Sequence, residues 1–261
     1  MILKEGGNVF KTDQGPLTQR IPTKAVHPTI QFIEKITGLT FDEEDWLGTT
    51  GKKNDPDGSF EKNSSGDLDL NTDANKVTKE ELINKLTAWL KSKGIPEDQI
   101  MNQGRKFTGG WIHNAGDQVH FRAPIQGGEG YVQTDFMFTD DPDYQRGAKR
   151  GGTAQYSGKD RAVLLSSIAR GRGFKFSPKF GLQNAETGEL VSKDWNQIAQ
   201  LLLGPNAKES DTHTVETIIA ALKGDPDFEA LTAKAREDFA KDGKKLPESA
   251  ELTRIKQLSG I

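Results

Sequence analysis

The stretch that decides the fold is Ser64-Ser65-Gly66-Asp67-Leu68-Asp69-Leu70. Its last four residues alternate strictly between acidic and apolar side chains, which predicts a β-strand with one polar and one apolar face. Side chains at positions i and i+2 of a strand point to the same face, so Asp67 and Asp69 are expected side by side. Two adjacent carboxylates repel each other, whereas a hard divalent cation bound through oxygen converts the repulsion into coordination. The pattern therefore predicts a metal site.

A third aspartate, Asp135, lies in the middle of an otherwise strand-like run from Tyr131 to Phe138. Aspartate is a poor strand former, and a carboxylate left unpaired inside a sheet loses its hydration without compensation. A partner is therefore implied. Three carboxylates on adjacent strands can hold two Mg²⁺ ions about 4 Å apart, and we expect Mn²⁺ to substitute for them. We predict Asp67, Asp69 and Asp135 to be the metal ligands and the catalytic residues.

Small and hydroxyl-bearing residues precede the aspartates. Ser65 and Gly66 offer a hydroxyl and a backbone that can approach phosphate oxygens closely. Gly48 and Thr49, at the end of a short predicted strand, also offer a hydroxyl and a backbone that can approach phosphate closely. Two lysines that can neutralise phosphate charge follow them. The candidate nucleotide-binding residues of this region are Gly48, Thr49, Lys52, Lys53, Ser65 and Gly66.

Two other loop motifs fit this region poorly. The run from Gly48 to Lys53 resembles a Walker A loop, but that motif needs four residues between its glycines and a Ser or Thr after the lysine. Asp55, Asp57 and Ser59 resemble the start of a calcium loop, but no acidic residue stands at the last position of that motif. We interpret residues 54–63 as an insertion.

The remaining pattern predicts an α+β protein. Residues 1–45 are expected to form a polar arm with a short helix that has Pro28 in its first turn and ends at Gly38. Thr78 and Glu81 form a capping box that begins a further helix. Beyond Gly110 the alternation of apolar residues predicts an antiparallel meander.

The second half of the chain is predicted to be mostly helical. Apolar runs begin at Val163 and Ile198, and a small hairpin is expected between Phe174 and Leu190. We therefore expect three parts: an arm over residues 1–45, a domain with a mixed sheet over 46–144, and a helical lobe over 145–261.

The composition excludes sites that need cysteine and indicates where the protein is located. Cysteine is absent, so disulfides, zinc–thiolate sites, iron–sulfur clusters and cysteine nucleophiles are excluded. No stretch approaches the roughly 20 apolar residues that span a bilayer, and the N-terminus lacks the apolar core of a secretion signal. We expect a cytoplasmic protein without a membrane partner.

Positive charge is concentrated in one segment of this acidic chain. Between Tyr144 and Phe180, nine basic residues face one acidic residue, a net charge of +8, so the rest of the chain carries −11 of the total −3. Such a segment indicates a surface that faces a polyanion, although a solvated basic face would give the same pattern. The candidate nucleic-acid contacts are Arg146, Lys149, Arg150, Lys159, Arg161, Arg170, Arg172, Lys175 and Lys179.

These motifs together resemble the nucleotidyltransferases related to DNA polymerase beta, the family X DNA polymerases. That family places Gly-Ser at a strand end, then Ser-Ser-Gly-Asp-x-Asp, then a third Asp on a later strand. Here Thr49 replaces the serine and keeps its hydroxyl. The resemblance implies a polymerase-beta-like palm with a mixed sheet, followed by a mostly helical, thumb-like lobe with a small hairpin.

The resemblance extends from Trp46 to about Pro205. Gln155-Tyr156-Ser157-Gly158 is similar to the family's Tyr-Phe-Thr-Gly turn, which packs against the sugar of the incoming nucleotide, so Tyr156 and Gly158 become candidate nucleotide contacts. The segment that starts at Phe176 is similar to the polymerase thumb. The chain's small size and its insertion are also reminiscent of bacteriophage-encoded proteins.

The chain departs from the polymerases in two places. Its first 45 residues are too short for the family's lyase domain and DNA-gripping hairpins. Val163 and Ser167 replace side chains that touch the base and the template in the polymerases. The use of a template is therefore left open.

The resemblance implies transfer of a nucleoside monophosphate from an NTP or dNTP to an acceptor hydroxyl, with release of pyrophosphate. Asp67 and Asp69 would bind both metals, and Asp135 would complete the site that activates the acceptor. A DNA or RNA 3′ end is the expected acceptor. Transfer to a protein or small molecule, and an inactive nucleic-acid-binding relative, remain alternatives. The scattered histidines His27, His113, His120 and His213 are expected to be structural or surface residues.

Overall fold

The computed structural model describes residues 9–50, 64–102, 109–150, 152–153 and 155–247. Contacts between residues divide the chain into two compact units, Met1–Pro142 and Asp143–Ile261. Each unit contains its own hydrophobic cluster. The helix that the sequence analysis assigned to a separate arm belongs to the core of the first unit.

A five-stranded mixed sheet forms the centre of the first unit. Its strand order is β4-β6-β9-β8-β7, in which β6 and β9 run parallel and the other neighbours run antiparallel. The predicted α+β class, the mixed sheet and the antiparallel meander are therefore confirmed. The strands are β4 (Trp46–Leu47), β6 (Asp67–Asp73), β7 (Ile112–Ala115), β8 (Gln118–Pro124) and β9 (Tyr131–Thr139).

Short two-residue strands flank this sheet on the N-terminal side of the chain. β1 pairs with β2, and β3 pairs with the first two residues of the motif, Ser64 and Ser65. The strands are β1 (Lys11–Thr12), β2 (Gly15–Pro16), β3 (Ile21–Pro22) and β5 (Ser64–Ser65).

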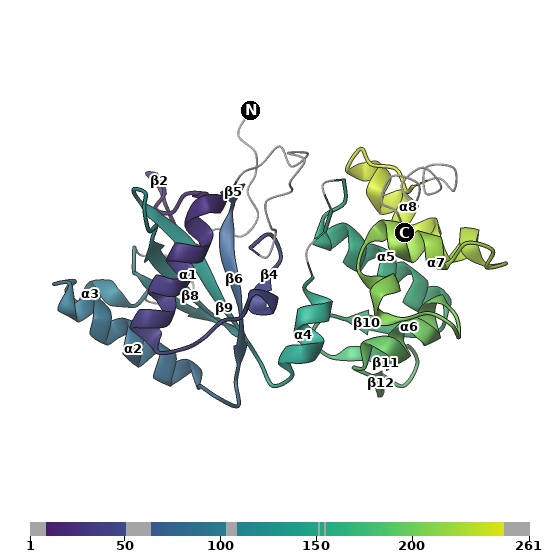
Figure 1. Ribbon diagram of the computed structural model, residues 1–261, viewed down its shortest axis with the longest axis horizontal. Coiled ribbons are helices and arrows are strands. Elements are labelled where there is room, and N and C mark those ends of the chain that lie inside the picture. The colour runs from purple at the N-terminus through teal and green to yellow at the C-terminus, as the bar shows by residue number, and fades with distance from the viewer. Residues whose placement is uncertain (1–8, 51–63, 103–108, 151, 154, 248–261) are drawn as a thin grey trace. The chain divides into compact units, whose positions relative to one another are not determined.

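Two helices cover one face of the mixed sheet, as Figure 1 shows for α1 (Thr23–Thr37) and α2 (Lys79–Ser92). The predicted capping box of Thr78 and Glu81 begins α2, and its leucine stripe is fully buried. α1 begins five residues before Pro28, so the prediction of Pro28 in its first turn was wrong. The unit also contains α3 (Glu97–Ile100) and the 3₁₀ helix η1 (Glu43–Asp45).

The two faces of the sheet differ in character. Leu68 and Leu70 of β6 and Phe136 of β9 point into the cluster beneath α1 and α2. Because side chains alternate along a strand, Asp67 and Asp69 point to the opposite face. The fold thus buries the apolar half of the motif and presents its carboxylates on the sheet face away from those helices.

The second unit is mostly helical, with a small antiparallel sheet. Its core surrounds α5, whose Leu164, Leu165 and Ile168 are fully buried. The expected hairpin is in fact a three-stranded sheet of β10 (Phe174–Ser177), β11 (Gly181–Asn184) and β12 (Leu190–Ser192). The helices are α4 (Pro142–Ala148), α5 (Gly158–Gly171), α6 (Trp195–Leu203), η2 (Glu209–Thr212), α7 (Val215–Ala221) and α8 (Phe228–Lys241). In the described part of the chain, every helix is too short or too polar to span a bilayer.

Candidate metal and nucleotide site

The three predicted aspartates come together on the polar face of the mixed sheet. Asp69 of β6 lies directly beside Asp135 of β9, and Asp67 lies two residues earlier on β6. One carboxylate oxygen from each residue lies within 4.8 Å of the other two. Asp135 is buried, while Asp67 and Asp69 are partly exposed, so the cluster is open to solvent on the β6 side.

This arrangement fits a divalent cation. Carboxylate oxygens are the ligands preferred by hard cations, and three of them at this spacing offer a preformed set. Acidic clusters also occur without metals, and the choice of Mg²⁺ over other hard divalent ions stays a prediction.

Both oxygens of Asp135 are held by neighbouring side chains. Nδ1 of His120 lies 2.7 Å from Oδ1, and Nε2 of Gln133 donates to Oδ2 at 3.0 Å. An ionised carboxylate only accepts hydrogen bonds, so His120 carries its proton on Nδ1 when Asp135 is charged. The carboxylate is therefore fixed in orientation before any ligand binds.

A second layer of contacts supports these two residues. The ring of His113 stacks on that of His120, with centroids 5.7 Å apart, and Asn102 contacts Nδ1 of His113 at 2.9 Å. Burial, with a smaller contribution from His120, lowers the pKa of His113 and favours its neutral form. The backbone N–H of Val9 donates to Oε1 of Gln133 at 2.9 Å. The orientation of Asp135 thus depends on the N-terminal segment and on β7 and β8.

The end of β4 lies against Asp69. Gly48 adopts a left-handed conformation with φ +55°, and a Cβ at this position would lie 2.8 Å from Oδ2 of Asp69. The backbone N–H of Asp69 donates to Oγ1 of Thr50 at 2.7 Å, and the hydroxyls of Thr49 and Ser65 lie 2.6 Å apart. The predicted Gly48, Thr49, Ser65 and Gly66 therefore surround the aspartate pair.

Arg20 supplies a cation beside this loop. Its guanidinium donates to Oγ of Ser64 at 3.0 Å and to the Ser64 carbonyl at 2.9 Å. A Cβ on Gly66 would lie 3.3 Å from the Nη1 atom of Arg20. The predicted cations Lys52 and Lys53 lie outside the described residues.

No family model and no curated protein matches this chain.

The two predicted nucleotide contacts in the second unit occupy structural positions. Tyr156 is 2% exposed, stacks on Phe239 and donates its hydroxyl proton to the Lys245 carbonyl at 2.6 Å. Gly158 is the first residue of α5. The side chain of Tyr156 is a core residue of this unit.

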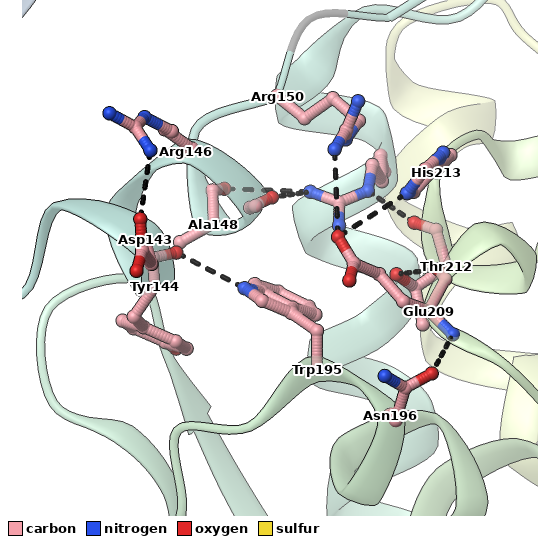
Figure 2. A network of polar contacts seen from close by, with 12 residues as sticks. Asp143, Tyr144, Arg146, Ala148, Arg150, Trp195, Asn196, Glu209, Thr212 and His213 are labelled. Atoms are coloured by element: carbon pink, nitrogen blue, oxygen red, sulfur yellow. Dashed lines mark hydrogen bonds and ion pairs between the residues drawn. The ribbon is translucent and has the colours of Figure 1, made fainter. Parts of the chain in front are cut away.

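Arg161 does not face a polyanion, which corrects the expectation drawn from the basic segment. It is 1% exposed, and its guanidinium donates to the carbonyls of Thr212 and Gly147 at 2.5 and 2.9 Å. Burial and the nearby Arg150 lower its pKa to about 10. Figure 2 shows Arg150 and His213 converging on the Glu209 carboxylate. This network joins α4, α5 and η2.

Several of the other predicted cations form ion pairs within the second unit. Arg146, Arg150, Lys159 and Arg172 form ion pairs with Asp143, Glu209, Asp242 and Asp225, respectively. Lys149 is partly exposed, whereas Arg170, Lys175 and Lys179 are exposed. The cationic surface is therefore smaller than the sequence suggested.

Sequence analysis missed three residues of the site: Arg20, His120 and Gln133. His120 and Gln133 could have been noticed from their positions, because each is a polar residue within a run that is predicted to be a β-strand. Arg20 carries no local signal, because the β3–β5 pairing that brings it to Ser64 joins distant parts of the chain.

Proposed function

We propose that this protein is a metal-dependent nucleotidyltransferase of the polymerase-beta-like kind, with its active site on the polar face of the mixed sheet. One observation carries the proposal: Asp67, Asp69 and Asp135 converge within 4.8 Å from two adjacent parallel strands. The hydroxyl and glycine residues around Asp69 support it, since they suit a triphosphate that approaches the backbone closely.

In the proposed reaction, an acceptor hydroxyl oxygen attacks the α-phosphorus of a nucleoside triphosphate. A new phosphoester bond forms, the bond between the α-phosphorus and the bridging oxygen breaks, and pyrophosphate leaves with that electron pair. Two bound Mg²⁺ ions would lower the pKa of the acceptor hydroxyl and offset the charge of the phosphates.

The protein residues have distinct tasks. Asp67 and Asp69 would hold both ions, and Asp135 would complete the ion site nearest the acceptor. His120 and Gln133 fix the orientation of Asp135, so the acceptor side of the site is preorganised. Thr49, Ser65 and Arg20, which lie around the aspartate pair, would donate to the triphosphate oxygens.

A nucleic acid 3′ end is the acceptor that the charge distribution favours. Residues 143–261 contain 19 basic and 16 acidic residues, a net charge of +3, whereas residues 1–142 contain 16 and 22, a net charge of −6. A cationic unit in an acidic protein is suited to a polyanionic partner.

The test is incorporation of labelled NTPs and dNTPs into single-stranded and primed DNA and RNA, with Mg²⁺ or Mn²⁺. We expect label at a nucleic acid 3′ end, and its loss in Asp69→Asn and Asp135→Asn. Asp73→Asn is the matched control, because Asp73 lies further along β6 and accepts its hydrogen bonds from Asn75 through an oxygen that asparagine keeps.

Label on polypeptide or on a small molecule would support nucleotidyl transfer but show that the acceptor is not a nucleic acid. Failure to label any acceptor with either metal, or full activity in Asp69→Asn, would overturn the proposal.

A further inference from the structure

The small sheet of the second unit displays two large apolar side chains to solvent. Phe180 is 55% exposed and Leu190 is 57% exposed, and both stand out among the large hydrophobic residues of the described chain. Single exposed apolar residues are ordinary, so the case for a binding surface depends on what accompanies these two on the small sheet.

Gly181 connects Phe180 to the strand over which Leu190 packs. Gly181 follows Phe180 directly and adopts φ +90°. A Cβ at this position would lie 2.7 Å from Cδ1 of Leu190 and 2.9 Å from Cγ of Lys193. The glycine, one residue after Phe180, thus leaves the space in which Leu190 and the stem of Lys193 lie over β11.

Lysines accompany the apolar pair on the same side of the sheet. Phe176, Leu182 and Ser192 are paired and buried on the inner side, so Lys175 and Gln183 point outward by alternation. The register shift between β11 and β12 pairs Leu190 with Gln183, and Leu190 is exposed on that same outer side. We call this outer side, with the adjoining turn, the β10–β12 face. Its residues are Lys175, Lys179, Phe180, Gln183, Leu190 and Lys193.

The aromatic ring already contacts a cation on this face. Nζ of Lys179 lies 5.2 Å from the centroid of the Phe180 ring, and Nζ of Lys193 lies 5.9 Å from that of Tyr144. The acidic residues Glu186 and Glu189 are exposed residues between β11 and β12, where the Glu189 carboxylate accepts a hydrogen bond from the Thr187 hydroxyl. The face therefore combines apolar surface with positive charge.

We propose that the β10–β12 face binds single-stranded nucleic acid, with a base stacked on Phe180 and packed against Leu190, and with phosphates near Lys175, Lys179 and Lys193. Stacking requires an unpaired base, because a duplex hides the faces of its bases. Three lysines around an apolar pair favour a polyanion over an apolar protein partner, which would have to desolvate each ammonium group.

This inference rests on the proposed function in one respect, since the bound strand would be the acceptor or a strand paired to it. Binding to the face itself requires no metal. The Asp69→Asn variant is therefore expected to bind single strands as tightly as the unaltered protein, which separates this inference from catalysis.

The experiment measures fluorescence anisotropy of a labelled oligothymidylate of about a dozen nucleotides with the full chain in EDTA. We expect Phe180→Ala to weaken binding by roughly fivefold or more, as the loss of one stacked base does, and Phe180→Tyr to retain affinity. Lys175→Gln and Lys179→Gln are each expected to lower the slope of log affinity against log salt by about 0.7. Lys223→Gln, at an exposed lysine after α7, is the matched control.

Equal affinities for Phe180→Ala and the unaltered protein would overturn the inference, as would binding of a blunt duplex of the same length as tightly as the single strand. Sedimentation of the unaltered chain as a dimer that Phe180→Ala converts to a monomer, without loss of oligonucleotide affinity, would also overturn it. That result would assign the face to contact between two copies.

Discussion

His120 is the residue on which the orientation of Asp135 depends most directly. Its Nδ1 atom contacts the carboxylate at 2.7 Å, and the ring is 5% exposed. Removing a group that orients a metal ligand typically weakens metal affinity about 10- to 100-fold. We expect His120→Ala to weaken Mn²⁺ binding by this factor, measured by electron paramagnetic resonance of free Mn²⁺.

His120→Asn is the matched variant for this measurement, because its amide can place a donor close to the position of Nδ1. We expect it to restore most of the metal affinity lost in His120→Ala, although both variants lose the stacking on His113. Equal losses in the two variants would show that packing of the imidazole, and not its hydrogen bond, maintains the site.

Gly48 offers a second test at the scale of one residue. Its φ of +55° makes any side chain there cost about 1–2 kcal/mol, and a Cβ would contact the Asp69 carboxylate at 2.8 Å. Gly94 has φ +78° but open space around its Cβ position. We expect Gly48→Ala and Gly94→Ala to lower stability to urea by similar amounts, while only Gly48→Ala weakens Mn²⁺ binding. Loss of metal affinity in both variants would contradict this reading.

At this scale the sequence predicted the three clustered aspartates but not the residues that hold them in place. Alternation along a strand was enough to place Asp67 and Asp69 together, because it is a local property. The contacts of Asp135 with His120 depend on the register between β8 and β9, which a single sequence does not encode locally. For the same reason the burial of Arg161 was missed, since its acceptors at Gly147 and Thr212 lie on other elements.

Among the elements, α5 depends on a capping box that also forms an ion pair. Ser157 and Asp160 exchange the two hydrogen bonds of the box, and Nζ of Lys244 donates to the same Asp160 oxygen at 2.5 Å. Burial acts to raise the pKa of Asp160, but the donors from Lys244 and Ser157 outweigh it, so the pKa is lowered. The charged carboxylate therefore stabilises the folded second unit.

A carboxyl group whose pKa is lower in the folded state stabilises the fold above its unfolded pKa of about 3.9, and this contribution is lost as pH falls through the folded value. We expect Asp160→Asn to reduce the free energy of unfolding by about 0.5–2 kcal/mol at neutral pH. Urea denaturation at decreasing pH should show the difference disappearing below the ordinary carboxyl pKa. A difference that persists unchanged to the lowest pH would show that packing of Asp160, and not its charge, matters.

Element prediction succeeded where the signals were local and failed where tertiary packing outweighed them. The capping box was sufficient to predict the start of α2, and the alternation of apolar residues was sufficient to predict the antiparallel meander. Pro28 was predicted to lie in the first turn of α1, yet the helix begins at Thr23, because Ala25 and Val26 are buried in the core and Pro22 fixes the entry. Burial of that extra turn outweighs the one backbone hydrogen bond that Pro28 removes.

At the scale of the whole molecule, the chain has two cores and an uneven charge. One cluster lies in Met1–Pro142 and the other in Asp143–Ile261, so each unit has the apolar burial expected of a body that folds by its own contacts. All three aspartates belong to the first unit, whereas the β10–β12 face belongs to the second. The proposed metal site and the proposed single-strand site therefore belong to different units.

This division predicts two calorimetric transitions that respond to different ligands and substitutions. A ligand that binds only the folded state stabilises it by about 2.7 kcal/mol at a concentration 100-fold above its Kd. Added Mn²⁺ is therefore expected to raise the midpoint of one transition alone. Leu164→Ala, in the second core, should lower the free energy of unfolding of the other unit by about 2–5 kcal/mol. The transition whose midpoint falls is then that of the second unit. A single transition that both Mn²⁺ and Leu164→Ala displace would show that the two units unfold together.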